Sequence, residues 1–294
     1  MSDPSQLSMI WSRKFEEHFA KPPPDVLHHY TTQSGVLGIV ESSVLWATKM
    51  QYLNDATELG FALDLAEQRI KEKRDNTSDS RIKERLSKLF TRRQNITNVN
   101  LFVACFCENG DLLSQWRGYS GASHGFSLAV KSAALDALAR PKGFRVGKCI
   151  YEFTTQLTVI DELVDESLTI QDDLQAAAAF EKGILRVGAF FKNEKFSEEN
   201  EWRIVSPIVD IHSWEVKFRQ GASMLIPYLD IAIGSNNGSA IQSAVVGPCP
   251  NAKLSASSVT MLFWTHGLRR TTTGAFGPTQ PKEVFESSIP YRNW

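Results

Sequence analysis

The chain has 294 residues, 42% of them hydrophobic, which is enough apolar material for a sizeable buried core. Its 32 lysines and arginines nearly balance 33 aspartates and glutamates, so the formal charge of −1 excludes a global field that would gather nucleic acid or an anionic membrane. The four cysteines form no CxxC pair, and no run approaches the roughly 20 apolar residues of a membrane span, so we expect a reduced, cytoplasmic protein without a membrane partner.

The first part of the chain is predicted to form a helix and a linker ahead of one domain. An amphipathic helix is expected at about residues 6–20, and Pro22-Pro23-Pro24 separates it from the next strand, because proline halts a helix. We therefore assign residues 1–24 to an N-terminal helix with a proline-rich linker, and residues 25–294 to a single domain.

Strands and helices then alternate up to residue 93. A short buried strand from Leu27 to Thr32 enters a helix that we expect Ser34 to cap, and Val44–Thr48 returns as a strand. Asn54-Asp55 is a turn that opens a helix through about residue 73. Residues 81–93 form a helix with a cationic surface, which is either an ordinary solvated face or a contact surface for an acidic partner.

The rest of the chain contains the centre of the predicted sheet. Asn100–Cys107 is continuously apolar and should be a strand in the middle of the sheet, whereas residues 154–191 are mostly helical. A helical turn is expected at Leu112–Tyr119, and Ser255–His266 should be a helix. Further strands are predicted at residues 125–130, 144–153, 200–209, 214–219, 223–228, 243–247 and 282–287.

Two short segments carry most of the chemistry-bearing side chains. In the first, the imidazole of His29 lies two residues before the hydroxyl of Thr31. In the second, Glu199 and Glu201 alternate on a strand and share a face, while Trp202 points to the other face. Each segment also has a plain structural interpretation: a hydrogen-bonded histidine at a strand end, and a surface carboxylate pair answering nearby lysines.

A set of small motifs gives the chain a family resemblance that covers roughly residues 25–294. The chain resembles the bacterial family known as domain of unknown function 2971, and the order of its strand-one His-x-Thr and late Glu-x-Glu is similar, more loosely, to the ADP-ribosyltransferase superfamily. The motifs are His29-Tyr30-Thr31, Leu45-Trp46-Ala47-Thr48, Asn54-Asp55-x-x-Glu58, Cys107-Glu108, Trp116-Arg117-x-Tyr119, Glu199-x-Glu201-Trp202-Arg203, Gly247-Pro248 and Ile289-Pro290-Tyr291-Arg292.

The looser resemblance implies a fold and a reaction. The fold would be α+β, with an ADP-ribosyltransferase-like twisted, mostly antiparallel split β core surrounded by helices. His29 would hold the ribose on the nicotinamide side of NAD, and the backbone of Tyr30 would pair with the carboxamide. Glu201 would bond the ribose 2′-hydroxyl and stabilise the positive charge as the bond to nicotinamide breaks. Glu199 would orient or deprotonate the acceptor.

The resemblance leaves other roles open. Either Arg117 or Arg203 would hold the pyrophosphate, since a guanidinium matches phosphate oxygens in pairs. The ring that stacks on nicotinamide is Tyr52, Trp116 or Tyr119. The remaining groups that we expect at the NAD site are Thr31 and Asn54, although Asn54 also suits a turn and helix cap, and Trp116 and Arg117 also suit packing with a buried ion pair.

One departure from the superfamily concerns the middle strand. That strand often carries Ser-Thr-Ser, whereas this chain has Ala104-Cys105-Phe106-Cys107, so support for Glu201 is missing or comes from Ser114 or Tyr119. No Cys/His pair has ligand spacing, and we expect no metal.

The expected function is transfer of ADP-ribose from NAD to a macromolecular acceptor, protein or nucleic acid, or hydrolysis of NAD by the same cleavage. The analogy alone suggests a bacterial toxin or phage-defence setting. The alternative is a catalytically inactive module of the same fold that binds a nucleotide or a protein partner, because fold does not determine activity.

Overall fold

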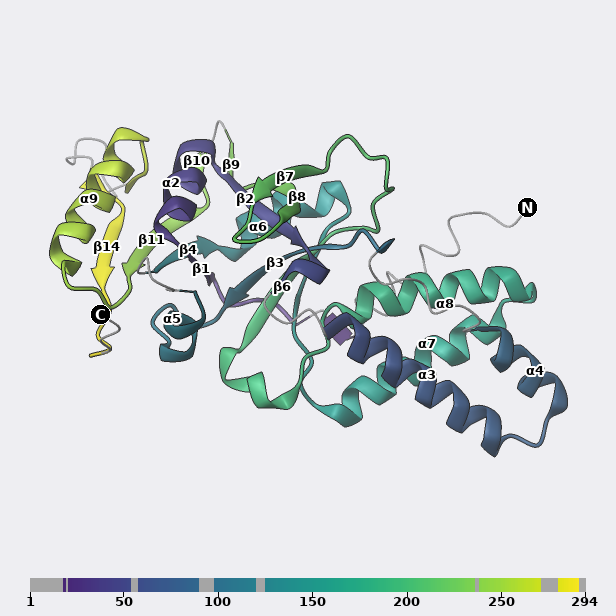
Figure 1. The fold of residues 1–294 in the computed structure, drawn as a ribbon. Coiled ribbons are helices and arrows are strands. Elements are labelled where there is room, and N and C mark those ends of the chain that lie inside the picture. Colours follow the sequence, from purple (N-terminus) through teal and green to yellow (C-terminus); the bar gives the residue numbers. More distant parts are fainter. Residues whose placement is uncertain are drawn as a thin grey trace.

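The computed structural model describes residues 18–19, 21–53, 58–89, 98–119, 125–235, 238–270 and 280–290. Most of the described strands join one 10-stranded sheet that is packed against helices (Figure 1). The strands of this sheet are β1 (Val26–Thr31), β2 (Val44–Lys49), β3 (Phe102–Cys107), β4 (Phe126–Lys131), β5 (Arg145–Lys148), β6 (Glu201–Val205), β7 (Lys217–Gln220), β8 (Leu225–Ala232), β11 (Ile241–Val246) and β14 (Glu283–Glu286).

The helices lie between these strands in the chain. They are α2 (Gln33–Ser42), α3 (Glu58–Asn76), α4 (Ser80–Leu89), α5 (Leu113–Tyr119), α6 (Ser132–Ala139), α7 (Phe153–Thr169), α8 (Asp173–Gly188) and α9 (Ala252–Thr265), with 3-10 turns at η1 (Met50–Tyr52), η3 (Arg140–Lys142) and η4 (Glu194–Glu199). Two short ribbons complete the described elements: β9 (Gly234–Ser235) with β10 (Gly238–Ser239), and β12 (Arg269–Arg270) with β13 (Gln280–Pro281).

The sheet forks at its central strand. Its main path runs β14-β11-β4-β1-β3-β2-β8-β7, and β6 lies along β3 with β5 beyond it. Because β6 pairs with β3 from Val103 to Cys107, β1 and β2 must share the opposite edge: β2 meets β3 at Val103, and β1 meets it at Cys107. Among the described strands, β11 and β14 alone pair in parallel. The prediction of an α+β fold with a mostly antiparallel split β core is therefore confirmed, as one forked sheet.

The two faces of the sheet bury different hydrophobic clusters. Phe102, Ala104 and Phe106 of β3 pack into a cluster with residues of α2, α6 and α9. Val103 of β3 packs on the other face into a cluster with α3, α4, α7 and α8, the helices that gather on the right of Figure 1. This alternation explains why Asn100–Cys107 reads as continuously apolar: β3 is covered on both faces.

The helix after β1 corrects one local prediction. Helix α2 begins at Gln33 and is capped by Thr32, whose Oγ1 accepts a hydrogen bond from the Gly35 N–H at 3.2 Å. Ser34 is already inside the first turn, so the expectation that it caps the helix is wrong.

Two other predictions concern parts of the chain outside the description. The helix expected at residues 6–20 lies outside the described residues except for 18–19, and the Asn54-Asp55 turn lies outside them altogether. Among the described helices, none combines the length and the apolar character needed to cross a membrane.

Candidate functional site

The register of the strands places His28, rather than His29, on the same row as Glu201, the carboxylate that the sequence predicts to be catalytic. His28 faces Cys107 across β1 and β3, and Cys107 faces Glu201 across β3 and β6. Side chains of residues that face each other across a sheet point to the same side. His28, Cys107 and Glu201 therefore form one row on the sheet, and alternation sends His29 to the opposite face.

A small cavity lies on this row, between β1, β3, α5 and η4. Its volume is about 30 Å³, and its lining residues are His28, His29, Tyr30, Cys105, Cys107, Gln115, Glu199 and Glu201. The fold thus brings together the two segments that the sequence singled out. A cavity of this size holds about one water molecule.

The ring of His29 fills the fork of the sheet. Its Nδ1 donates a hydrogen bond to the carbonyl oxygen of Cys105 at 2.9 Å, at the place where β1 and β3 separate. The ring also lies 5.5 Å from that of Phe106. Burial lowers the pKa of His29 more than the Cys105 bond raises it. The imidazole of His29 is therefore neutral at pH 7, with Nδ1 engaged by the backbone.

The ring of His28 packs against a glycine. Its Nδ1 is 3.5 Å from the Ser127 hydroxyl, and burial lowers the pKa of His28. A Cβ atom added to Gly110 would lie 2.3 Å from His28 Nδ1, closer than non-bonded atoms allow. Only glycine at position 110 leaves the imidazole where it is.

We expect Gly110→Ala to displace the His28 ring and to destabilise the fold by about 1–3 kcal/mol, the usual cost of overpacking. Urea unfolding measures the loss. The matched control is Gly118→Ala on α5, where a Cβ meets nothing within 4 Å. It should stabilise the fold by about 0.5–1 kcal/mol because alanine is the better helix former. Equal effects of the two substitutions would contradict the contact.

Glu201 is the centre of a buried ion network. It accepts a hydrogen bond from Arg203 Nε at 2.8 Å and one from Lys192 Nζ at 2.5 Å. Arg203 also donates to Glu58 at 2.6 Å and to the Ala189 carbonyl at 2.6 Å. Arg203 is only 1% exposed, so in this structure it is a partner of Glu201 rather than an exposed phosphate ligand.

Glu199 belongs to the same network but is nearer to solvent. It accepts a hydrogen bond from Lys192 Nζ at 2.6 Å, and its side chain keeps 18% exposure against 4% for Glu201. Lys192 thus bridges the two carboxylates of the Glu-x-Glu pair. Of these carboxylates, Glu199 is the one that an incoming molecule meets first.

The network keeps Glu201 ionised. Burial alone would raise the pKa of Glu201, but the charges of Arg203 and Lys192 outweigh it and lower that pKa to about 2. The pKa of Glu58 is instead raised, by burial first, with the neighbouring Glu201 charge adding to it and Arg203 opposing it. A fixed negative charge therefore borders the cavity at neutral pH.

The lowered pKa predicts how stability depends on pH. Since the folded value of about 2 lies below the reference value of 4.5, ionised Glu201 stabilises the fold above pH 4.5, and this contribution is lost as the pH falls toward 2. The difference in unfolding free energy between the wild type and Glu201→Gln should shrink from about pH 5 to about pH 3. Urea unfolding at each pH measures this difference; a difference that does not change between pH 5 and pH 3 would contradict the assignment.

The thiol of Cys105 takes the position expected for a supporting hydroxyl. Cys105 points to the same face as Arg203, its partner on β6, and its side chain helps to lower the pKa of Glu201. The hydroxyl of Ser114 is buried and has no hydrogen-bond partner among the described residues, so it does not support Glu201. Cys105 therefore meets both segments that the sequence singled out: its carbonyl oxygen accepts from His29, and its side chain influences Glu201.

Tyr30 and Trp116 pack together as structural groups beside the cavity. The Tyr30 hydroxyl donates to the Asn109 carbonyl and accepts from the Leu112 N–H, both at 2.9 Å, and its ring meets Trp116 edge to face at 4.8 Å. Trp116 is 0% exposed, and its Nε1 donates to Asp111 at 2.7 Å. A ring enclosed in this way offers no open face for stacking on nicotinamide.

Asp111 also fixes the end of the described chain. It accepts hydrogen bonds from the Ser287 hydroxyl and from the N–H and hydroxyl of Ser288. Ile289 of the Ile-Pro-Tyr-Arg motif then packs against the Tyr30 and Trp116 cluster. Ile289, the first residue of the Ile-Pro-Tyr-Arg motif, therefore packs against the cluster that contains Tyr30 of the His-Tyr-Thr motif.

The other predicted site residues are scattered. Arg117 is exposed on α5, Tyr52 is half-buried in η1, and half-buried Thr31 packs its Oγ1 against Gly35. Asn54 and the side chain of Tyr119 lie outside the described residues. None of these groups lines the small cavity among the residues that the structure describes.

Two of the four cations in the described part of the basic helix, Arg85 and Lys88, have acidic partners within the molecule. Arg85 donates to Asp173 at 2.9 Å and to two backbone carbonyls, and Lys88 binds Glu84 at 2.6 Å and Asp173 at 3.1 Å. Arg81 and Lys83 are exposed. Arg85 is thus held by part-buried contacts within the molecule, whereas Lys88 forms its ion pairs at the surface.

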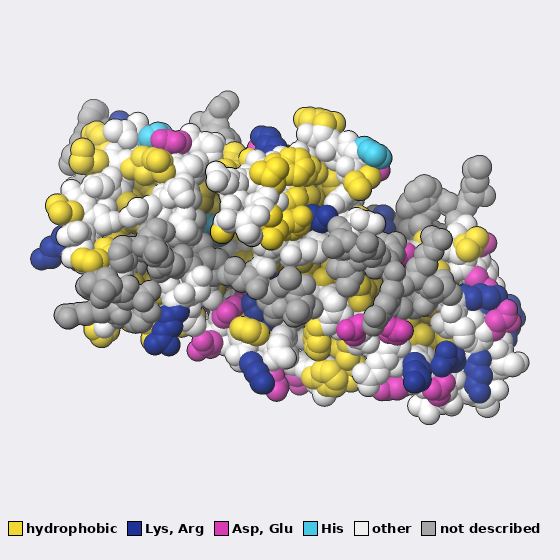
Figure 2. All heavy atoms as spheres, in the orientation of Figure 1, with side chains coloured by type: hydrophobic (Ala, Val, Ile, Leu, Met, Phe, Trp, Pro, Cys, Tyr) yellow, Lys and Arg dark blue, Asp and Glu magenta, His cyan; other side chains and the backbone are white. Residues whose placement is uncertain are grey.

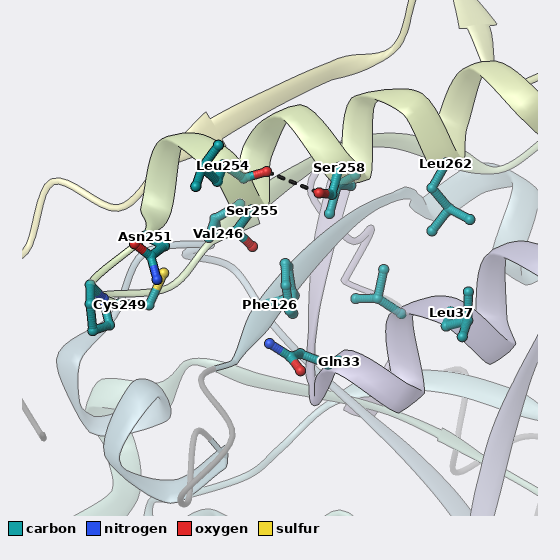
Figure 3. Close-up of a pocket in the computed structure, with 13 residues that line it drawn as sticks. Gln33, Leu37, Phe126, Val246, Cys249, Asn251, Leu254, Ser255, Ser258 and Leu262 are labelled. Atoms are coloured by element: carbon teal, nitrogen blue, oxygen red, sulfur yellow. Dashed lines mark hydrogen bonds between the residues drawn. The ribbon is translucent and has the colours of Figure 1, made fainter.

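A larger cavity lies elsewhere, between α2 and α9 (Figure 3). Its volume is about 610 Å³, and its walls include Leu37, Phe126, Val246, Leu254 and Leu262. It shares no lining residue with the small cavity. In the described ranges, no group of three His, Cys, Asp or Glu side chains is arranged to hold a metal ion.

Comparisons with known proteins give one family and one solved structure. Residues 115–204 match the family described as "Protein of unknown function (DUF2971)", which confirms the resemblance for the segment from Gln115 to Ile204. No curated protein matches the chain. The chain is similar to the solved structure "Thermus sp. 2.9 DarT in complex with ADP-ribosylated ssDNA", with a TM-score of 0.33, 12% identity, and coverage of 90% of this chain and 95% of that chain.

Proposed function

We propose that the protein cleaves NAD at the nicotinamide bond and transfers the ADP-ribose to a macromolecule or to water. The observation that carries this proposal is the small cavity bordered both by β1, with His28 and Tyr30, and by the carboxylates Glu199 and Glu201. Glu201 would face the ribose carbon as it becomes positive. Because its charge is fixed by Arg203 and Lys192, no reorganisation is needed during the reaction.

The roles of the other groups follow from their positions. The bond between C1′ of the ribose and the pyridine nitrogen breaks, nicotinamide leaves with the bonding electrons, and the acceptor oxygen or nitrogen attacks C1′. Glu199, the more exposed carboxylate, would take the proton of the acceptor. His28 shares the face of Glu201 and would contact the ribose, whereas His29 would keep the fork of the sheet in place.

Binding of NAD requires a local opening. A cavity of about 30 Å³ does not admit a pyridine ring and a ribose. Gln115 on α5 and Glu199 on η4 line the cavity from outside the sheet. We expect these two side chains to move when NAD enters.

The experiment is a nicotinamide-release assay. Wild-type protein is incubated with NAD alone, and with cell lysate, protein or nucleic acid as acceptor, and free nicotinamide is measured by liquid chromatography. Release by the wild type and by the exposed neighbour variant Glu198→Gln, together with loss in Glu201→Gln, supports the enzyme. No release under any of these conditions overturns it.

A second function is favoured by the complete pairing of Glu201, whose two oxygens already accept hydrogen bonds from Arg203 and Lys192. A catalytically inactive module would use the same site to bind a nucleotide, with the ion network serving only the fold. Calorimetry separates the two functions: binding of NAD or ADP-ribose without nicotinamide release, unchanged in Glu201→Gln, supports the module.

A further inference from the structure

An exposed aromatic pair with a nearby arginine lies on the open part of the sheet formed by β2, β8 and β7. Trp46 is 42% exposed, and its ring centroid is 4.7 Å from that of Tyr228, with the ring planes tilted by 36°. The guanidinium carbon of Arg219 lies 5.9 Å from the Trp46 ring centroid. Figure 2 shows hydrophobic side chains gathered over β7 and β8 near the top centre of the view.

Strand register explains why these groups share a face. Thr48 of β2 pairs with Tyr228 of β8, and Tyr228 pairs with Lys217 of β7, so these three side chains point to one side of the sheet. A residue two positions away on the same strand points to that side as well. Trp46 and Arg219 are such residues. The opposite face of β2 and β8 holds Leu45, Ala47, Leu229 and Ile231, all buried in the core. The exposed Trp46 therefore belongs to none of the hydrophobic clusters that the structure describes.

The charge of this face is positive. Asp230 is neutralised by Lys217 at 2.5 Å. Arg219 forms no ion pair with any carboxylate of the described residues: its one recorded hydrogen bond is to the Thr48 hydroxyl at 3.5 Å, and its Nε is buried without a partner. Burial lowers the pKa of Arg219, as expected for a cation without a counterion. With Asp230 paired to Lys217, the positive charge of Arg219 is the excess charge among these groups on the face.

The same face leads to the candidate site. Thr48 of β2 pairs with Val103 of β3, and Val103 pairs with Val205 of β6. Alternation along β3 and β6 then puts Glu201 on the side that carries Trp46. A ligand on the aromatic pair would lie two strands away from the carboxylate.

We propose that Trp46, Tyr228 and Arg219 form a binding surface for single-stranded nucleic acid. A base stacks on the open side of the Trp46 and Tyr228 rings, and the guanidinium of Arg219 meets the adjacent phosphate. Rings that stack on any base bind with little sequence preference, and a duplex, whose bases are already stacked, fits less well. That the bound strand is also the acceptor of ADP-ribose rests on the proposed function; the binding does not.

The test is fluorescence anisotropy with a labelled 20-nucleotide single strand, as DNA and as RNA, in the absence of NAD. We expect binding in the range of about 1–100 µM at physiological salt, as for contacts without sequence readout. Trp46→Ala should weaken it about tenfold or more, and Trp46→Phe, which keeps a ring, by much less. Arg219→Gln should also reduce the slope of log affinity against log salt concentration by about one unit, which corresponds to the loss of one phosphate contact.

The chain offers a matched control. Trp264 on α9 is 46% exposed and also has an arginine over its ring, Arg269 at 4.8 Å, but no second aromatic ring pairs with it in the part of the chain that the structure describes. Trp264→Ala should leave binding unchanged. No binding by the wild type, equal loss in Trp46→Ala and Trp264→Ala, or tighter binding of the duplex would overturn the proposal. Single-strand binding without ADP-ribose transfer would leave the surface standing and remove only its acceptor role.

Discussion

Replacement of Arg203 by methionine is expected to destabilise the fold by about 3–5 kcal/mol, because it leaves two buried carboxylates with Lys192 as their one remaining cation among the described residues. Arg203 lies 2.8 Å from Glu201 and 2.6 Å from Glu58, and both acids are almost fully buried. Methionine fills much of the arginine volume, so the loss reports charge rather than a cavity. Urea unfolding followed by circular dichroism measures it.

Two further variants make the Arg203 result specific. Arg81→Met, on an exposed position of α4, should change the unfolding free energy by no more than about 0.5 kcal/mol. Adding Glu58→Gln to Arg203→Met should recover part of the lost unfolding free energy, because Glu58 then no longer places a negative charge in the core without Arg203 beside it. A loss below about 1 kcal/mol for Arg203→Met, or no recovery in the double variant, would show that the network does not stabilise the fold as described.

Glu201→Gln is expected to reduce nicotinamide release by about 100- to 1000-fold, the usual effect of removing one preorganised electrostatic group. The amide keeps the shape of the side chain but not the negative charge opposite the developing cation. The loss should fall on kcat, with KM for NAD little changed, because the charge is needed in the transition state. Initial rates at several NAD concentrations separate the two constants.

The folded state of Glu201→Gln must be verified, since Arg203 and Lys192 lose a partner in it. Circular dichroism at the assay temperature does this. Glu199→Gln should retain NAD cleavage by water better than transfer to an acceptor, because Glu199 is assigned to the acceptor proton. Activity of Glu201→Gln within about threefold of the wild type would contradict electrostatic catalysis by this carboxylate.

Much of the fold could be predicted because its strands carry their own signals. The apolar run at Asn100–Cys107 is the centre of the forked sheet, and residues 154–191 are α7 and α8 with a short break at Ile170–Asp172. The strand predicted at 200–209 is β6, at Glu201–Val205. Local composition therefore located these elements to within a few residues.

The contacts between the site residues could not be predicted, because they depend on strand register and on how deeply each side chain is buried. Sequence alone pairs His29 with Thr31, but which histidine faces Glu201 depends on the His28 to Cys107 register. The prediction that Glu199 and Glu201 alternate on one strand is wrong: Glu199 ends the 3-10 turn η4, Asn200 takes a left-handed conformation, and β6 begins only at Glu201, although both carboxylates line the small cavity. The burial of Arg203 was not readable from the sequence. The available sequence signal for a partner of Arg203 was Glu58, the last residue of the Asn-Asp-x-x-Glu motif.

Support for Glu201 shows a similar limit. The residue types of the middle strand suggested that a hydroxyl was missing, and the structure places the Cys105 thiol there instead. A thiol is a weak donor that sequence patterns do not distinguish from a small apolar side chain. Lys192 was readable only as a surface partner of the carboxylates, although it is 8% exposed.

The most direct measurement is a crystal structure of the protein with a non-cleavable NAD analogue whose ribose oxygen is replaced by carbon. The prediction is that the nicotinamide-side ribose lies within hydrogen-bond distance of Glu201, with His28 beside it and with Gln115 and Glu199 displaced. An analogue bound in the α2 and α9 cavity, or no analogue bound while Glu201 keeps its contacts to Arg203 and Lys192, would contradict the proposed site.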